Sequence, residues 1–167
     1  MEDVVKLLKE AGAILEGHFI GTSGRHMSVY ITKDTWFPHT ATVSKVCLML
    51  AELNKDKGIE VVVGPALGGV VLSTWTAYHL SQMTGKEVLS VFTEKTPENG
   101  QVFKRGYDKL VAGKRVLLVE DTVATGSSIR KVIEAVRGAG GNLVQVSLVV
   151  NRVSNNVNAD TLGVPLN

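Results

Sequence analysis

Four short runs of apolar residues alternate with segments of helical length, and this alternation limits the possible folds more than any other feature of the chain. The apolar runs occupy residues 59–63, 87–92, 115–119 and 143–150. Apolar residues at helical spacing fill residues 40–57, 69–84 and 127–136. Strands separated by helices predict βαβ units and a mostly parallel sheet. Because the runs are so rich in apolar residues, we expect helices on both faces of the sheet and an α/β fold.

Composition narrows the class of protein. The 167 residues suit one domain, and 44% hydrophobic residues are enough for a core. A net charge of +2 gives no sign of a nucleic-acid surface. We find no secretory signal, and no apolar run approaches the roughly 20 residues that a membrane span needs. The single cysteine, Cys47, fits a reducing compartment, and its apolar helical surroundings favour a core position over a nucleophile. We therefore expect a cytoplasmic protein that binds neither nucleic acid nor a membrane.

Polar or glycine-rich residues follow each predicted strand. They are Gly64–Gly69, the polar stretch 93–109, the acid pair Glu120-Asp121, and Asn151-Arg152. The stretch 93–109 is expected to be a loop, either a lid or a solvated connector. Residues 153–167 are polar too and are expected to form a loop or tail. In open α/β sheets, ligands bind outside the carboxyl ends of the strands. The sequence therefore predicts one ligand site at that edge.

The most informative segment is residues 116–128, where an apolar run leads to Glu120 and Asp121 and then to a turn rich in glycine and hydroxyl groups. Such a turn at the start of a helix offers backbone N–H groups and the positive end of the helix dipole, which suits a phosphate. The carboxylates suit hydroxyl groups beside the phosphate, as an acid at a strand end does for ribose. Together they predict a ribose 5-phosphate site. The alternative is that the acids and serines only cap the helix.

Residues 116–128 also resemble the signature with which type I phosphoribosyltransferases bind phosphoribosyl pyrophosphate (PRPP). The resemblance implies that Glu120 and Asp121 bind the ribose hydroxyls. The turn would bind PRPP, chiefly its 5-phosphate, through Thr122, Ala124, Thr125, Gly126, Ser127 and Ser128. The loop after the first strand would hold pyrophosphate through Ala66, Leu67, Gly68 and Gly69. The alternative is that this loop has a purely structural role. Mg²⁺ would be bound with PRPP, without a cage of protein side chains.

Residues 17–30 are similar to the N-terminal hood of orotate phosphoribosyltransferases, which implies that Arg25 and Tyr30 contact the base. Arg152 would bind the carboxylate of orotate; the alternative is a surface arginine at a strand end. The resemblance makes Lys95 a lid cation that acts on the departing pyrophosphate. The expected catalytic residues are therefore Asp121, Glu120 and Lys95.

We expect one domain over residues 1–167 with the type I phosphoribosyltransferase fold, an α/β fold. A small N-terminal hood would occupy about 12–37. The core, at about 40–152, would contain a mostly parallel sheet flanked by helices. The resemblance implies transfer of ribose 5-phosphate from Mg-PRPP to a nucleobase, with orotate as the first candidate. A purine or another pyrimidine as the acceptor is one alternative. A regulator that senses PRPP without turnover is another. The resemblance also implies a homodimer.

Overall fold

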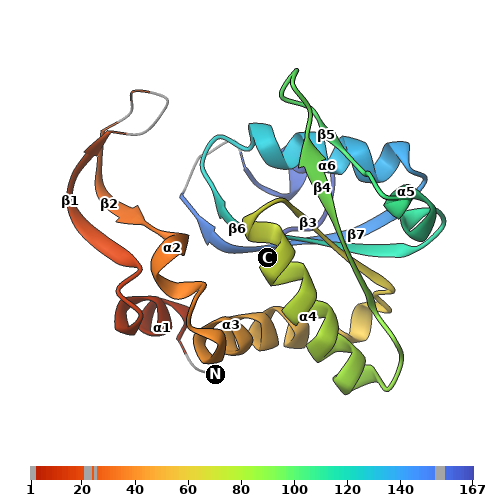
Figure 1. Cartoon of the computed structure of the whole chain (residues 1–167), viewed down its shortest axis with the longest axis horizontal. Coiled ribbons are helices and arrows are strands. Elements are labelled where there is room, and N and C mark those ends of the chain that lie inside the picture. Colours follow the sequence, from red (N-terminus) through yellow and green to blue (C-terminus); the bar gives the residue numbers. More distant parts are fainter. Residues whose placement is uncertain (1–2, 21–23, 25, 153–156) are drawn as a thin grey trace. The chain divides into compact units, whose positions relative to one another are not determined.

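The structure is a computed structural model that describes residues 3–20, 24, 26–152 and 157–167 (Figure 1). The chain divides into two compact units, residues 1–46 and 47–167. Among the described residues, no helix is both long enough and apolar enough to cross a membrane.

The N-terminal unit contains a two-stranded hairpin and three helical segments. Helix α1 (Val4–Glu10) begins at Asp3, whose carboxylate accepts a hydrogen bond from the backbone N–H of Val5 at 2.9 Å. Strands β1 (Ile14–Ile20) and β2 (His26–Ile31) pair antiparallel. The short helix α2 (Lys33–Trp36) follows, and α3 (Thr40–Glu52) continues into the second unit.

The C-terminal unit is built on a five-stranded sheet in the order β5-β4-β3-β6-β7. Its strands are β3 (Val61–Pro65), β4 (Leu89–Lys95), β5 (Gln101–Val102), β6 (Arg115–Val123) and β7 (Asn142–Asn151). β3 pairs parallel with β4 and β6, β6 pairs parallel with β7, and β5 runs antiparallel to β4. The predicted α/β fold with a mostly parallel sheet is thus confirmed.

Helices cover both faces of this sheet. α4 (Gly68–Thr84) lies on the near side of the sheet in Figure 1, and α6 (Ser127–Gly138) lies on the far side. The α6 residues whose spacing predicts the helix are buried: Ile129, Val132, Ile133 and Val136. They form one cluster with Val63 and Leu118 of the sheet. Val62 and Leu117 are equally buried and alternate with the residues of this cluster, so they point to the opposite face.

The prediction of a helix over residues 40–57 is wrong at its C-terminal end. α3 ends at Glu52, and a 3₁₀ turn, η1 (Lys55–Lys57), follows. The reason is Asn54, a fully buried residue whose side-chain amide donates to the carbonyl oxygen of Leu50 at 2.7 Å. The backbone N–H of Asn54 then donates to the carbonyl of Ala51 instead of continuing the helical pattern. A side chain that competes for backbone carbonyls in this way ends a helix.

Two segments that we expected to be loops have regular structure. The stretch 93–109 contains the end of β4, the strand β5 and the start of helix α5 (Tyr107–Val111). The segment 157–167 contains α7 (Ala159–Leu162) and a parallel bridge between Leu166 and Val146. Three apolar residues of this segment are buried in the core: Val157, Leu162 and Val164. The expectation of a polar tail is therefore wrong, because a few apolar residues suffice to fix a segment against the core.

Candidate functional site

The order of the strands places two candidate loops next to each other. β3 and β6 are neighbours, with Val61 paired to Val116 and Val63 paired to Leu118. From β3 the chain passes through α4 to β4 on one side, and from β6 it passes through α6 to β7 on the other. Ligands of open α/β sheets bind where the connections diverge in this way, outside the carboxyl ends of the strands. The residues that follow β3 and β6 are therefore the first candidates for binding.

The acid pair lies inside a strand. We had expected it to follow the strand. β6 continues through Glu120 and Asp121 to Val123, because β7 pairs with it up to Asn151. Both acids are half-buried. The Glu120 Oε1 atom accepts the N–H of Asp121 at 3.2 Å, and the Asp121 Oδ1 atom accepts the N–H of Thr122 at 2.7 Å. These backbone contacts orient the two carboxylates at the carboxyl end of the sheet.

The turn from β6 to α6 exposes the side chains expected to bind phosphate. Ala124, Thr125, Ser127 and Ser128 are exposed, and Thr122 is half-buried at the end of β6. The N-cap of α6 is Gly126, without a side-chain hydrogen bond at the cap. The alternative that the acids and serines cap the helix is therefore wrong. The first turn of a helix has N–H groups without acceptors within the helix, and these groups are suited to an anion.

Gly126 is required at this turn for two reasons. Its φ of 81° lies in the left-handed region, which L side chains rarely adopt. A Cβ atom at this position would also lie 2.8 Å from the Cγ2 atom of Val157. The segment that begins at Val157 therefore packs against this turn.

The loop after β3 is shaped by contact between two glycine backbones. A Cβ atom on Gly64 would lie 2.2 Å from the carbonyl oxygen of Gly69, and one on Gly69 would lie 2.6 Å from the carbonyl carbon of Gly64. The N–H of Ala66 donates to the carbonyl of Thr93 on β4 at 2.8 Å, and the Ala66–Leu67 peptide bond is cis. Leu67 is 81% exposed, whereas Gly68 is buried at the start of α4. Gly64 and Gly69 thus have a packing role, and Ala66 and Leu67 face outward from the loop.

The cations after β4 are not in an open loop. The structure places Lys95 at the end of β4, opposite Gln101 of β5, where its side chain is exposed. Lys104 and Arg105 return along the hairpin and form ion pairs with Glu94. This pairing was not visible in the sequence, because the three residues meet only when the hairpin forms.

The residues expected to contact a base lie in different parts of the chain. Arg152 is half-buried after β7, and its N–H donates to the carbonyl of Val123 at 3.0 Å, which places it beside the end of β6. Tyr30 lies on β2 in the N-terminal unit, 38% exposed, with its ring centroid 5.5 Å from that of Phe19. Arg25 lies outside the described residues.

Cys47 occupies the core, as expected. It is fully buried on α3, and burial raises the pKa of its thiol to about 12. A protonated thiol is a poor nucleophile. Among the described residues, no three His, Cys, Asp or Glu side chains come together as a metal site.

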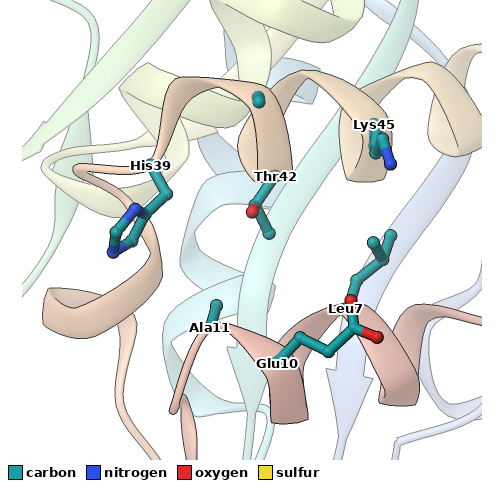
Figure 2. Close-up of a pocket in the computed structure, with 7 residues that line it drawn as sticks. Leu7, Glu10, Ala11, His39, Thr42 and Lys45 are labelled. Atoms are coloured by element: carbon teal, nitrogen blue, oxygen red, sulfur yellow. The ribbon is translucent and has the colours of Figure 1, made fainter.

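Each unit has a cavity. The first, of about 240 Å³, belongs to the N-terminal unit, and Figure 2 shows Glu10 and Leu7 of α1 facing Thr42 and Lys45 of α3 across it. The second, of about 670 Å³, is lined by residues at the opposite ends of the strands, among them Ile59, Leu89 and Lys114. Neither is lined by a residue of the β6–α6 turn or of the loop after β3.

Comparison with known proteins gives consistent matches. The model of the phosphoribosyl transferase domain family matches residues 37–162. The orotate phosphoribosyltransferase of Bartonella quintana (strain Toulouse) is 40% identical over 168 residues, which cover 99% of the chain and 81% of that protein.

Solved structures resemble the chain over nearly its whole length. The orotate phosphoribosyltransferase of Mycobacterium tuberculosis H37Rv in complex with inorganic phosphate has a TM-score of 0.76 and 25% identity, and the match covers 98% of this chain and 90% of that one. The same enzyme in complex with PRPP has a TM-score of 0.73 and 24% identity, with 99% and 93% covered. The range matched by the family model includes the candidate residues from Ala66 to Arg152.

Proposed function

This chain belongs to the phosphoribosyltransferase family, and we propose that it transfers ribose 5-phosphate from Mg-PRPP to orotate, giving orotidine 5′-monophosphate and pyrophosphate. The observation that carries the proposal is the juxtaposition, at one sheet edge, of the acid pair on β6 and the glycine loop after β3. Its 40% identity to an orotate phosphoribosyltransferase supports the choice of acceptor.

In this proposal the β6–α6 turn binds the ribose 5-phosphate half of PRPP. The N–H groups of Thr125 to Ser128 and the hydroxyl groups of that turn donate to the phosphate. Glu120 and Asp121 accept hydrogen bonds from the ribose hydroxyls, and their positions are fixed by the backbone amides described above. The sugar is thereby oriented with its anomeric carbon toward the β3 loop.

The loop Ala66–Gly69 binds the pyrophosphate half. The close approach of Gly64 and Gly69 turns the backbone sharply at the end of β3, which leaves Ala66 and Leu67 at the edge of the sheet. During transfer, the bond from the anomeric carbon to the pyrophosphate oxygen breaks. A bond to the orotate ring nitrogen forms, and the proton of that nitrogen passes to water. Lys95 is proposed to stabilise the charge that builds up on the departing pyrophosphate.

Arg152 is proposed to bind the carboxylate of orotate. The backbone N–H of Arg152 donates to the carbonyl of Val123 at the end of β6, which supports a role next to the proposed ribose site. A guanidinium can grip a carboxylate with two parallel hydrogen bonds, which a neutral base cannot form. From the family resemblance we add Tyr30 and Arg25 as residues that contact the base.

Mg²⁺ is proposed to bind with PRPP. The half-buried carboxylates Glu120 and Asp121 provide the hard oxygen ligands that Mg²⁺ prefers. We propose that the pyrophosphate and ribose oxygens of PRPP and water supply most of the ligands of the ion. When bound, Mg²⁺ would neutralise charge on the pyrophosphate.

A homodimer and a cytoplasmic location complete the proposal. We infer the dimer from the family resemblance, and the composition of α4 supports it. No charged residue occurs in this 17-residue helix, although Trp75 and Tyr78 lie on its outer side. By contrast, α6 carries four charged residues: Arg130, Lys131, Glu134 and Arg137. Sedimentation equilibrium of the purified chain tests the oligomeric state.

The test of the reaction is a screen of free bases with Mg-PRPP, in which pyrophosphate release and nucleotide formation are both measured. Orotate should be consumed, and uracil and the purines should not. Consumption of a neutral base but not of orotate would contradict the acceptor while keeping the transferase. PRPP binding without any product would favour a regulator.

A further inference from the structure

Glu94 lies between two cations of the β4–β5 hairpin. Its Oε2 atom is 3.2 Å from Lys104 Nζ, and its Oε1 atom is 3.0 Å from Arg105 Nη2. The Glu94 side chain is 23% exposed, whereas those of Lys104 and Arg105 are 54% and 58% exposed. The contact with Arg105 lacks the geometry of a hydrogen bond, and Oε1 has no hydrogen-bond partner among the described residues. The carboxylate is therefore less exposed than the two cations with which it pairs.

Arg105 is held in an unusual backbone conformation. Its φ of 60° lies in the left-handed region, and Gly106 follows with a φ of 77°. A non-glycine residue rarely adopts this conformation without stabilising contacts. Here the guanidinium pairs with Glu94 and lies 5.7 Å from the ring centroid of Phe92. Glu94 thus helps to stabilise the backbone conformation at Arg105, where the hairpin leads into α5.

The cluster lies next to the loop that we assign to pyrophosphate. Pro65 of β3 is paired with Thr93 of β4, and the N–H of Ala66 donates to the carbonyl of Thr93. Glu94 is the next residue along β4. The tip of the hairpin is also tied to the phosphate-binding helix, because Lys131 Nζ of α6 donates to the carbonyl of Asn99 at 2.6 Å. The carboxylate that pairs with the two cations is thus one residue away from the strand position that contacts Ala66, and the tip of the same hairpin contacts α6.

We propose that Glu94 is a positioning residue that competes with pyrophosphate for Lys104 and Arg105. This inference rests on the proposed function. In the free protein the carboxylate holds both cations at the hairpin. Pyrophosphate carries more negative charge than one carboxylate, so it draws the exposed cations toward the Ala66–Gly69 loop. When pyrophosphate leaves, Glu94 takes the cations back, which weakens retention of the product.

The experiment compares pyrophosphate binding to wild-type protein and to Glu94→Gln by calorimetry in the presence of Mg²⁺. Removal of the competing charge should tighten binding by about fivefold, the scale of one exposed ion pair. Glu94→Asp keeps the charge and should bind close to wild type. The matched control is Glu60→Gln, since Glu60 pairs with Lys114 at 2.9 Å at the other end of the sheet. It should leave pyrophosphate binding unchanged.

Two further measurements separate positioning from simple loss of structure. The gain in Glu94→Gln should disappear when Lys104 and Arg105 are also replaced by alanine, and product inhibition by pyrophosphate should strengthen together with binding. If the wild type converts orotate and the folded Glu94→Gln variant binds pyrophosphate equally or more weakly, this inference alone is overturned. A wild type that neither converts orotate nor binds pyrophosphate would overturn the proposed function and this inference together.

Discussion

Glu120 and Asp121 are the residues on which PRPP binding is expected to depend most. Each carboxylate can accept a charge-assisted hydrogen bond from a ribose hydroxyl, which is worth roughly 1.5–3 kcal/mol. Glu120→Gln and Asp121→Asn should therefore each lower kcat/KM for PRPP by about 10- to 150-fold. Steady-state kinetics at varied PRPP measures this, with circular dichroism to confirm folding. Wild-type kinetics in the double variant would contradict the assignment of the ribose site.

Arg152 is expected to decide which base reacts. Without its guanidinium, the orotate carboxylate loses a bidentate partner, while a neutral base loses nothing. Arg152→Ala should therefore lose most of the preference for orotate over uracil, and its affinity for PRPP should stay near wild type. Competition between the two bases measures the ratio. A preference that survives the substitution would make Arg152 a surface arginine at a strand end.

Cys47 should make stability depend on alkaline pH. Burial raises its pKa from 9.0 to about 12 in the folded protein, so the unfolded chain releases the proton first. The stabilising contribution is complete below about pH 9 and is lost as pH rises toward 12. Urea titrations from pH 8 to 10.5 should show a steeper loss of unfolding free energy in wild type than in Cys47→Ala. Equal slopes would contradict the buried thiol.

At the scale of elements, the β6–α6 turn depends on a segment far along the chain. Gly126→Ala adds a Cβ atom in a left-handed conformation and 2.8 Å from Val157. It should destabilise the fold by roughly 1–3 kcal/mol and weaken PRPP binding as well. Gly138→Ala is the control, because it lies within α6 with no atom within 4 Å of its Cβ position. Denaturant titration should show it neutral or slightly stabilising.

The sequence predicts elements well where one local pattern decides the structure. The apolar spacing of Ile129 to Val136 predicts α6, and the run before Glu120 predicts β6. Ends of elements are less predictable, because partners remote in sequence set them. β6 extends to Val123 only since β7 pairs with it, and α3 ends early because Asn54 also donates to Ser147 Oγ at 2.9 Å.

At the scale of the whole molecule, the strand order brings the candidate site together. The residue types around Glu120 indicate phosphate and ribose chemistry, and the rule for parallel sheets places them at one edge. No local sequence pattern encodes the packing that places β3 next to β6 as well as next to β4. The pairing of Glu94 with Lys104 and Arg105 likewise appears only with the hairpin.

Because PRPP is expected to join the loops after β3 and β6, it should stabilise the whole chain. A ligand at 100 times its Kd adds about 2.7 kcal/mol, which for a protein of this size is roughly 5–10 °C in Tm. Thermal unfolding with Mg-PRPP measures the shift, and Mg²⁺ with ribose 5-phosphate at the same concentration is the control. The double variant of Glu120 and Asp121 should show little shift, whereas a full shift there would place PRPP elsewhere.

The contact between Gly64 and Gly69 also has a genetic consequence. Every missense change of one nucleotide in a glycine codon introduces a residue with a Cβ atom. At either position that atom would meet backbone, at 2.2 Å for Gly64 and 2.6 Å for Gly69. Backbone atoms cannot rotate away as the end of a side chain can. Neither codon is therefore expected to accept a single missense change, whichever base a descendant of this protein accepts.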